Sequence, residues 1–249
     1  MTGKPFAGQC VVVTGGGTGI GRSTALAFAE GGADRVVITG RRPDRLAQVA
    51  ALHPVITTVT ADVSTEAGAD AVAEAIPGSF DVLVHNAGIH RRAPIEGIEL
   101  AAARDVFATN VIGPVILTLR LLPLLRAPGG NIIFVSSVAG HNPVPGESVY
   151  GASKAAVDSL TRTWAAELAP KGIRVNAVAP SLVRTEVFET NGMPPEAVDV
   201  LFEHAAKQMP LGRTGEPEDV TLWITRLAEP SSSWVTGQII VMDGGWDLA

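Results

Sequence analysis

Short runs of consecutive apolar residues alternate along the chain with longer segments in which apolar residues recur at helical spacing. The short runs are rich in Val and Ile and lack the strict apolar–polar alternation of a half-exposed strand. Strands buried on both faces of a parallel sheet have this composition. The predicted strands are Cys10–Thr14, Arg35–Thr39, Val55–Thr60, Val82–His85, Ile132–Ser136, Arg174–Ala179 and Ile239–Met242.

The segments between the strands carry the period of a helix. Gly21–Glu30 places apolar residues on one face and is followed by two glycines, and Ser148–Leu168 repeats apolar residues at three- and four-residue steps. Strands alternating with helices predict an α/β fold, a Rossmann-type doubly wound parallel sheet of about seven strands with helices on both faces. We find no repeat or long linker, so residues 1–249 are predicted to form a single domain.

Composition narrows the range of functions. Hydrophobic residues make up 46% of the chain, enough for a real core, and the formal net charge is −6. The acidic balance, without a Lys/Arg-rich stripe, argues against nucleic acid as a partner. Cys10, the single cysteine, has no internal disulfide partner, and residues 1–9 lack the apolar core of a signal peptide. No uninterrupted apolar run is long enough to span a membrane. We therefore expect a cytoplasmic protein with no membrane partner and no metal site.

The first predicted strand runs directly into the glycine-rich segment Thr14–Gly21 and then into a helix. Such a turn lets backbone N–H groups approach a pyrophosphate at the positive end of the helix. The G-x-G-x-x-G fingerprint does not fit, because Ile20 and Arg22 stand where its last glycine should be. Arg22 also replaces the lysine of a phosphate-loop NTPase. A glycine-rich turn without a ligand remains the alternative.

The second predicted strand ends in arginines. Dinucleotide sites that bind NAD usually have a carboxylate here for the ribose 2′-hydroxyl, but Arg41 and Arg42 follow Gly40 instead. Guanidinium groups match a phosphate bidentately. NADP(H) is therefore predicted as the preferred cofactor, with NAD(H) possible, and a pair of solvated loop arginines is the alternative.

Tyr150 and Lys154 lie four residues apart on the longest predicted helix, so they share one face. A nearby ammonium group favours the phenolate, which would lower the tyrosine pKa towards the range of a working acid or base. Ser137 follows a predicted strand, at the edge where such sheets bind ligands. An ordinary surface contact between the two helix residues is the alternative.

Together these motifs resemble those of the short-chain dehydrogenase/reductase family over nearly the whole chain, and they stand in the order and at the spacing that the family shows. The matching positions are Gly15, Gly19, Gly21, Asp62, Val63, Asn86, Ala87, Gly88, Asn110, Ser137, Tyr150 and Lys154. The resemblance implies an NADP-dependent oxidoreductase of the ketoreductase or alcohol dehydrogenase type. Such an enzyme transfers a hydride between NADP(H) and a carbonyl or secondary alcohol substrate.

The resemblance also implies roles for four residues. Tyr150 would protonate the developing alkoxide, and Ser137 would hydrogen-bond the same oxygen. Lys154 would lower the Tyr150 pKa and hold the nicotinamide ribose, while Asn110 would anchor a water molecule of a proton relay. A catalytically silent dinucleotide-sensing protein on the same fold is the alternative, which the intact set disfavours. An acyl hydrolase is excluded, because its nucleophile elbow needs glycine where Tyr150 stands.

Cofactor contacts are implied at many positions. They are Gly15, Thr18, Gly19, Ile20, Gly21, Arg41, Arg42, Asp62, Val63, Asn86, Ala87, Gly88, Tyr150, Lys154, Pro180, Val183 and Thr185. Two residues depart from the family pattern. Ser181 stands where the family usually has glycine, and its Cβ restricts positive φ, which puts the local geometry in question. His85 replaces a common asparagine, and we interpret it as a buried, hydrogen-bonded residue.

The substrate is not indicated by the sequence. Candidate contacts are Arg91, Arg92, His141 and Phe188, the last within a predicted substrate lid of about residues 186–209. Similar arginines follow the Asn-Ala-Gly segment in gluconate 5-dehydrogenase-like proteins, where one could bind a carboxylate, and solvated loop arginines are the alternative. The family pairs two long helices across subunits, which here correspond to residues 111–125 and 148–168, so a homotetramer is expected.

Overall fold

The computed structural model describes residues 4–190 and 192–248. Seven parallel strands form one sheet in the order β3-β2-β1-β4-β5-β6-β7. They are β1 (Cys10–Thr14), β2 (Arg35–Gly40), β3 (Ile56–Thr60), β4 (Val82–His85), β5 (Asn131–Val135), β6 (Arg174–Pro180) and β7 (Ile239–Met242). All seven predicted strands are confirmed, each within about one residue at either end.

The consecutive apolar residues of the strands are explained by two separate cores. Val11 and Val13 of β1 pack into one hydrophobic cluster, whereas Val12 between them packs into the other. Successive side chains of a strand point to opposite faces, so a sheet covered on both sides needs an apolar residue at every position.

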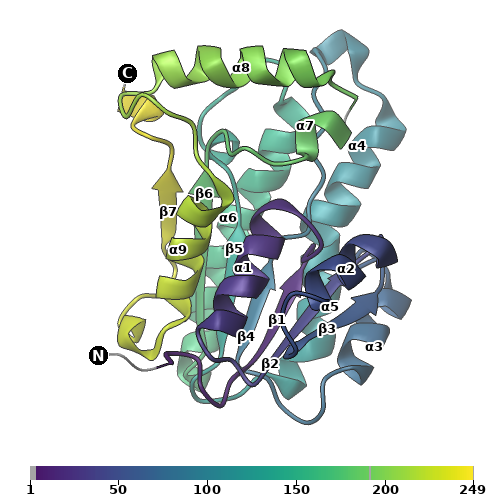
Figure 1. The fold of residues 1–249 in the computed structure, drawn as a ribbon, viewed down its shortest axis with the longest axis vertical. Helices are drawn as coiled ribbons and strands as arrows, with labels where there is room; N and C mark the ends of the chain where they lie inside the picture. The colour runs from purple at the N-terminus through teal and green to yellow at the C-terminus, as the bar shows by residue number, and fades with distance from the viewer. Residues whose placement is uncertain (1–3, 191, 249) are drawn as a thin grey trace.

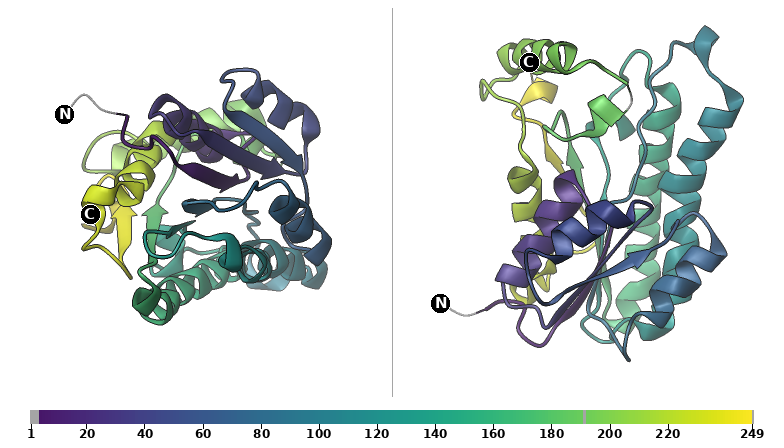
Figure 2. Two further views of the ribbon diagram at one scale, coloured as in Figure 1. Left: turned by 90° about the horizontal axis from the view of Figure 1, so that it is seen from below. Right: turned by 45° about the vertical axis from the view of Figure 1, so that its right-hand side comes forward.

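Helices cover both faces of the sheet, as predicted for a doubly wound fold (Figures 1 and 2). One face carries α1 (Gly19–Glu30), α2 (Pro43–Ala50) and α9 (Pro217–Ala228), and the other carries α3 (Glu66–Glu74), α5 (Gly113–Leu121) and α6 (Ser148–Leu168). The bounds of α6 are those predicted. Helix α1 begins at Gly19, two residues before the predicted start, because the last part of the glycine turn already has helical hydrogen bonding.

The predicted lid consists of two helices, α7 (Val187–Thr190) and α8 (Pro195–Gln208). Helix α8 lies across the carboxyl end of the sheet, above the site described below (Figure 1). Phe188 of α7 and Phe202 of α8 meet edge to face, with ring centroids 5.5 Å apart. Residue 191 of the predicted lid lies outside the described residues.

Helix α4 (Leu100–Phe107) continues through a π-helical turn, Ala108–Ile112, into α5. By length and composition alone, the segment Leu100–Leu124 would be apolar enough to cross a membrane. In the fold, Leu117 and Leu121 of this segment are buried in the core against the sheet. The segment therefore serves as a sheet-covering layer in this structure.

Candidate active site

The glycine turn after β1 is shaped by two residues in the left-handed region. Gly15 has φ +66° and Gly19 has φ +51°, conformations that disfavour residues with a Cβ. Gly21 is required for a different reason, since a Cβ there would lie 2.2 Å from Gly15 O. The turn is thus held tightly against the start of α1, leaving the helix N-terminus open to an anion.

Arg41 and Arg42 lie beside this turn, at the carboxyl end of β2. Arg42 Nη2 is 3.4 Å from Thr18 Oγ1. The Ser64 hydroxyl donates a hydrogen bond to Asp62 and lowers the pKa of that carboxyl, and the positive charge of Arg41 lowers the pKa further. Both guanidinium groups are exposed. The contact with Thr18 places Arg42 against the glycine turn, and the binding of a 2′-phosphate by the two arginines stays a prediction.

Asn86 fastens β1 to β4, where the strand order of the sheet reverses. Its Nδ2 donates to Thr14 O at 2.9 Å and to Gly15 O at 3.2 Å. Thr14 Oγ1 in turn accepts from the backbone N–H groups of Asn86, at 3.0 Å, and Ala87, at 2.9 Å. The side chain of Asn86 therefore holds the turn in shape, and ligands of open α/β sheets bind at this reversal point.

The four residues of the expected catalytic set come together at the carboxyl end of β4 and β5. The side chains of Ser137 and Tyr150 share a hydrogen bond. Lys154 Nζ donates to Val135 O at 2.8 Å and lies 5.7 Å from the centre of the Tyr150 ring. Gly88 adjoins the set, because a Cβ there would lie 3.3 Å from Asn110 Oδ1 and 3.7 Å from Lys154 Nζ.

Asn110 sits in the π-helical turn between α4 and α5, and both polar atoms of its side chain hydrogen-bond protein groups. Its Oδ1 accepts from Ile89 N at 2.9 Å, and its Nδ2 donates to Ile89 O at 3.0 Å and Ser153 Oγ at 3.1 Å. Asn110 thus fixes the loop after β4 against α6. π-Helical turns often occur at functional sites.

The pKa of Tyr150 departs from the expected lowering. Burial raises it to about 12, the Ser137 hydrogen bond opposes that change, and the charge of Glu147 raises the pKa further. Burial also lowers the pKa of Lys154 to about 8, against the opposing charge of Asp158. Desolvation is the largest cause of both pKa shifts. The phenol is consequently neutral near pH 7, the form that donates a proton.

The segment after β6 is compatible with serine. Ser181 N donates to Met242 O at 3.0 Å, and no non-glycine residue of the described ranges has positive φ. The backbone at position 181 therefore does not need glycine, and Ser181 fits there without strain. Further along, Thr185 faces the turn, with its Cγ2 3.0 Å from where a Cβ of Gly19 would lie.

His85 is buried at the end of β4, as interpreted. Its Nε2 lies 2.8 Å from Thr118 Oγ1, and its ring stacks on Phe134 with centroids 4.8 Å apart. Burial lowers the pKa of His85 to about 3. The residue is therefore neutral and part of the core.

The candidate substrate residues occupy different places. Phe188 approaches the site, at 6.1 Å from the ring of His90. His141 Nε2 lies 3.4 Å from Asp247 Oδ2, next to the carboxyl-terminal segment. Arg91 and Arg92 are exposed, and Arg92 Nη2 donates to Pro145 O at 3.2 Å.

His90 and Glu147 lie beside Tyr150 in the fold, and neither was predicted from the sequence as a site residue. The His90 ring meets Tyr150 edge to face, with centroids 4.6 Å apart. The available signal was position alone: His90 directly follows the Asn-Ala-Gly-Ile segment, and Glu147 precedes Tyr150 by nearly one helical turn.

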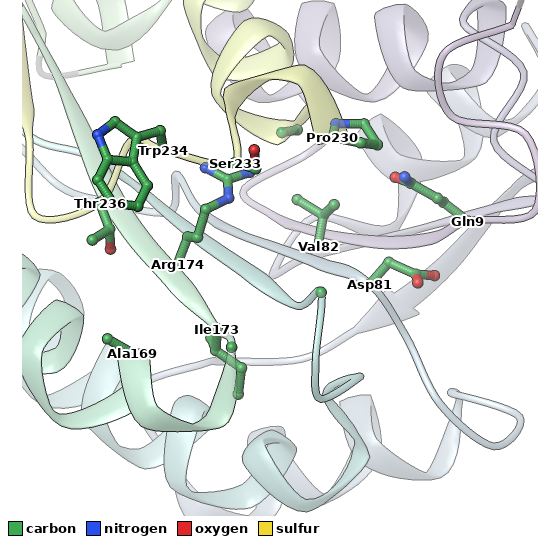
Figure 3. Close-up of a pocket in the computed structure, with 13 residues that line it drawn as sticks. Gln9, Asp81, Val82, Ala169, Ile173, Arg174, Pro230, Ser233, Trp234 and Thr236 are labelled. Atoms are coloured by element: carbon green, nitrogen blue, oxygen red, sulfur yellow. The ribbon is translucent and has the colours of Figure 1, made fainter.

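A separate cavity of about 600 Å³ opens at the amino-terminal end of the strands, away from Tyr150 (Figure 3). Gln9, Asp81 and Arg174 line it together with Trp234, which is 99% exposed. Arg174 has a structural role, since its Nη1 donates to Val235 O at 3.1 Å and its Nη2 donates to Leu227 O at 2.6 Å. None of the expected site residues contributes to this cavity.

Comparisons with known proteins agree with the geometry. The family model described as enoyl-(acyl carrier protein) reductase matches residues 15–247. The chain is 38% identical over 246 residues to a 3-oxoacyl-acyl-carrier-protein reductase of Thermotoga maritima, covering 96% of this chain and 97% of that one. It is 39% identical over 253 residues to a glucose 1-dehydrogenase of Gluconobacter oxydans, covering 98% and 93%.

A solved structure shares the fold throughout. It is a short-chain dehydrogenase/reductase of unknown function from Caenorhabditis elegans, determined with cofactor, with TM-score 0.92 and 34% identity over 98% of this chain and 97% of that one. The family match, the relatives and the shared fold lead to one conclusion: the chain belongs to the short-chain dehydrogenase/reductase family of oxidoreductases.

Proposed function

We propose that the protein is an NADP(H)-dependent carbonyl reductase, or alcohol dehydrogenase in the reverse direction. The observation that carries the proposal is the convergence of Ser137, Tyr150 and Lys154 at the carboxyl end of the sheet. NADP(H), when bound, supplies or accepts the hydride. The proposed substrate is a small carbonyl compound or secondary alcohol.

The residues around the glycine turn fit a phosphorylated dinucleotide. Glycine at positions 15 and 21 lets the turn pack against Asn86 and the start of α1, because a Cβ at either position would collide with protein atoms. The tight turn presents the N-terminus of α1, and phosphate groups bind at such helix ends. Arg41 and Arg42 bring two positive charges to the same place, where they would hold a 2′-phosphate. Asp62, Val63, Asn86 to Gly88, Pro180, Val183 and Thr185 complete the proposed contact surface.

The chain's own residues perform the proton chemistry in this proposal. Ser137 hydrogen-bonds the substrate oxygen, and Tyr150 donates its phenolic proton to that oxygen as negative charge develops. Lys154 supplies positive charge beside the phenol and holds the ribose. Asn110 anchors a water molecule behind Lys154. Phe188, His141, Arg91 and Arg92 are proposed to line the substrate side.

We also propose that the protein works as a homotetramer in the cytoplasm. Several large apolar residues from α4 through the π-helical turn into α5 are exposed: Leu100, Phe107, Ile112 and Leu119. An exposed apolar stripe of this kind is typical of a subunit interface. Light scattering on the purified protein measures the assembly, and a monomer would contradict this part of the proposal.

The test is a panel of ketones and aldehydes assayed with NADPH and NADH separately, following absorbance of the reduced cofactor. Tyr150→Phe is expected to lower turnover by a factor of about 10²–10⁴ while leaving NADPH binding intact. Wild-type turnover in that variant would refute the proposed role. Absence of cofactor oxidation with every carbonyl would instead favour a dinucleotide-sensing protein.

Cofactor choice is tested by removing the arginines. Each charge-assisted hydrogen bond to a phosphate contributes about 1.5–3 kcal/mol, so Arg41→Ala and Arg42→Ala should each raise the KM for NADPH by about tenfold or more. The KM for NADH should change little. A wild-type preference for NADH would overturn the role given to both arginines.

A further inference from the structure

His90 and Glu147 form a hydrogen-bonded pair directly beside Tyr150. His90 Nε2 lies 3.1 Å from Glu147 Oε1, and each of the two side chains is only 16% exposed. The imidazole meets the Tyr150 ring edge to face, with an interplanar angle of 85°. The pair is therefore in van der Waals reach of the phenol ring without belonging to the expected catalytic set.

Two loops hold the pair in place. His90 lies on the loop after β4, and Glu147 is the residue before the first turn of α6. Ala93 N donates to Gly146 O at 2.8 Å, which fastens one loop to the other. Asn110 hydrogen-bonds both backbone groups of Ile89, the neighbour of His90. The frame that positions the catalytic residues thus positions this pair as well.

The lid shields the pair from water. Phe188 of α7 is a second aromatic neighbour of His90, with ring centroids 6.1 Å apart. Charges in such a partly dehydrated place interact more strongly than exposed pairs, which contribute little. The next cations on the loop, Arg91 and Arg92, have exposed side chains, and that of Arg92 donates to Pro145 O.

We propose that His90 and Glu147 are positioning residues that set the net charge facing the Tyr150 phenol, and with it the pH range in which Tyr150 transfers its proton. This inference rests on the proposed function, because it concerns the same proton transfer. It assigns a purpose to two residues outside the set of Ser137, Tyr150 and Lys154.

The expected direction follows from the charges around the phenol. Lys154 from the same helix is the cation, Ser137 contributes a hydroxyl, and Glu147 is the anion, which raises the pKa of Tyr150. Removing the Glu147 charge should lower that pKa. Removing the His90 hydrogen bond should raise it, because the carboxylate then loses the donor that disperses its charge.

The first experiment measures the pH dependence of kcat/KM for alcohol oxidation, in which Tyr150 accepts the proton. Glu147→Gln should move the acidic limb to lower pH by about 0.5–1 unit, as expected for one nearby charge. His90→Phe keeps the ring contact and should move it to higher pH. The double variant should follow Glu147→Gln, and His53→Gln, remote from the site, should match wild type.

A second experiment needs neither substrate nor activity. Tyr150 is the only tyrosine of the chain, so phenolate absorbance, or one carbon-13 resonance of labelled tyrosine, reports this residue alone. Titration of the full-length protein should give a lower midpoint for Glu147→Gln than for wild type. His90→Gln replaces His90→Phe if the latter unfolds, as judged by circular dichroism.

The outcomes separate the two proposals. Profiles and titrations that coincide with wild type, or that shift in the same direction in both single variants, overturn the inference while leaving the proposed function intact. If wild type oxidises no alcohol and reduces no carbonyl, the proposed function fails. The tyrosine titration then still decides whether the pair controls the phenol.

Discussion

His85 gives a prediction whose size can be worked out from the structure. The residue is buried between Thr118 and Phe134, and its pKa falls from 6.5 to about 3. The unfolded chain therefore binds a proton on His85 between these two pH values, whereas the folded chain does not. Stability is fully present above pH 6.5 and decreases as the pH falls towards 3.

Each pH unit in that window costs about 1.4 kcal/mol of unfolding free energy. Lowering the pH from about 7.5 to 5.0 should therefore cost wild type about 2 kcal/mol through this residue alone. His85→Asn, which installs the residue common in the family, removes the titrating group. The variant should lose that contribution to the pH dependence, whatever the substitution does to stability at neutral pH.

The assay is urea unfolding at a series of pH values and one fixed protein concentration, because assembly makes apparent stability concentration-dependent. The measured quantity is the difference in unfolding free energy between the two ends of the series. His204→Gln, at an exposed helix position, serves as the control and should keep the wild-type slope. Equal slopes in wild type and His85→Asn would refute the argument.

Three further predictions concern the frame of the site. Gly21→Ala places a Cβ 2.2 Å from Gly15 O. The variant should lose about 1–3 kcal/mol of unfolding free energy in thermal unfolding and should bind NADPH more weakly. Wild-type stability and NADPH affinity would contradict the close approach. Asp219→Ala removes the capping box of α9 with Glu216 and should cost about 1 kcal/mol in urea unfolding, whereas Asp44→Ala should cost less. Asp158→Asn keeps the acceptor for the Ser136 hydroxyl but removes the charge that raises the pKa of Lys154. Because reductase activity depends on charged Lys154, the alkaline limb of its pH profile should move to lower pH. An unmoved limb would refute this role.

The strands and helix α6 could be predicted because their signals are local. A strand buried on both faces shows an uninterrupted apolar run, and Tyr150 and Lys154 share a face at a spacing of four residues. The glycine turn and the arginines after β2 were located by their order along the chain. The glycine turn and the arginines are expected to lie close together, because the adjacent parallel strands β1 and β2 end at the same edge of the sheet.

The size of a desolvation effect and the pairing of distant loops could not be predicted. The effect of Lys154 on Tyr150 was judged from charge alone, whereas desolvation of the phenol is the larger effect and has the opposite sign. His90 and Glu147 are 57 positions apart, and only the folded loops bring them together. Ser181 raised a question from family comparison that its actual backbone conformation answers.

The Asn86 bonds to Thr14 have a consequence for the order of folding. These bonds join residues 72 positions apart, so the glycine turn after β1 cannot be completed from its own segment. The chain must first close a loop of that length, which costs conformational entropy, before Asn86 can hold the turn in shape. A nascent chain that ends before β4 therefore lacks a finished binding turn, and dinucleotide binding should appear only after the two central strands have paired.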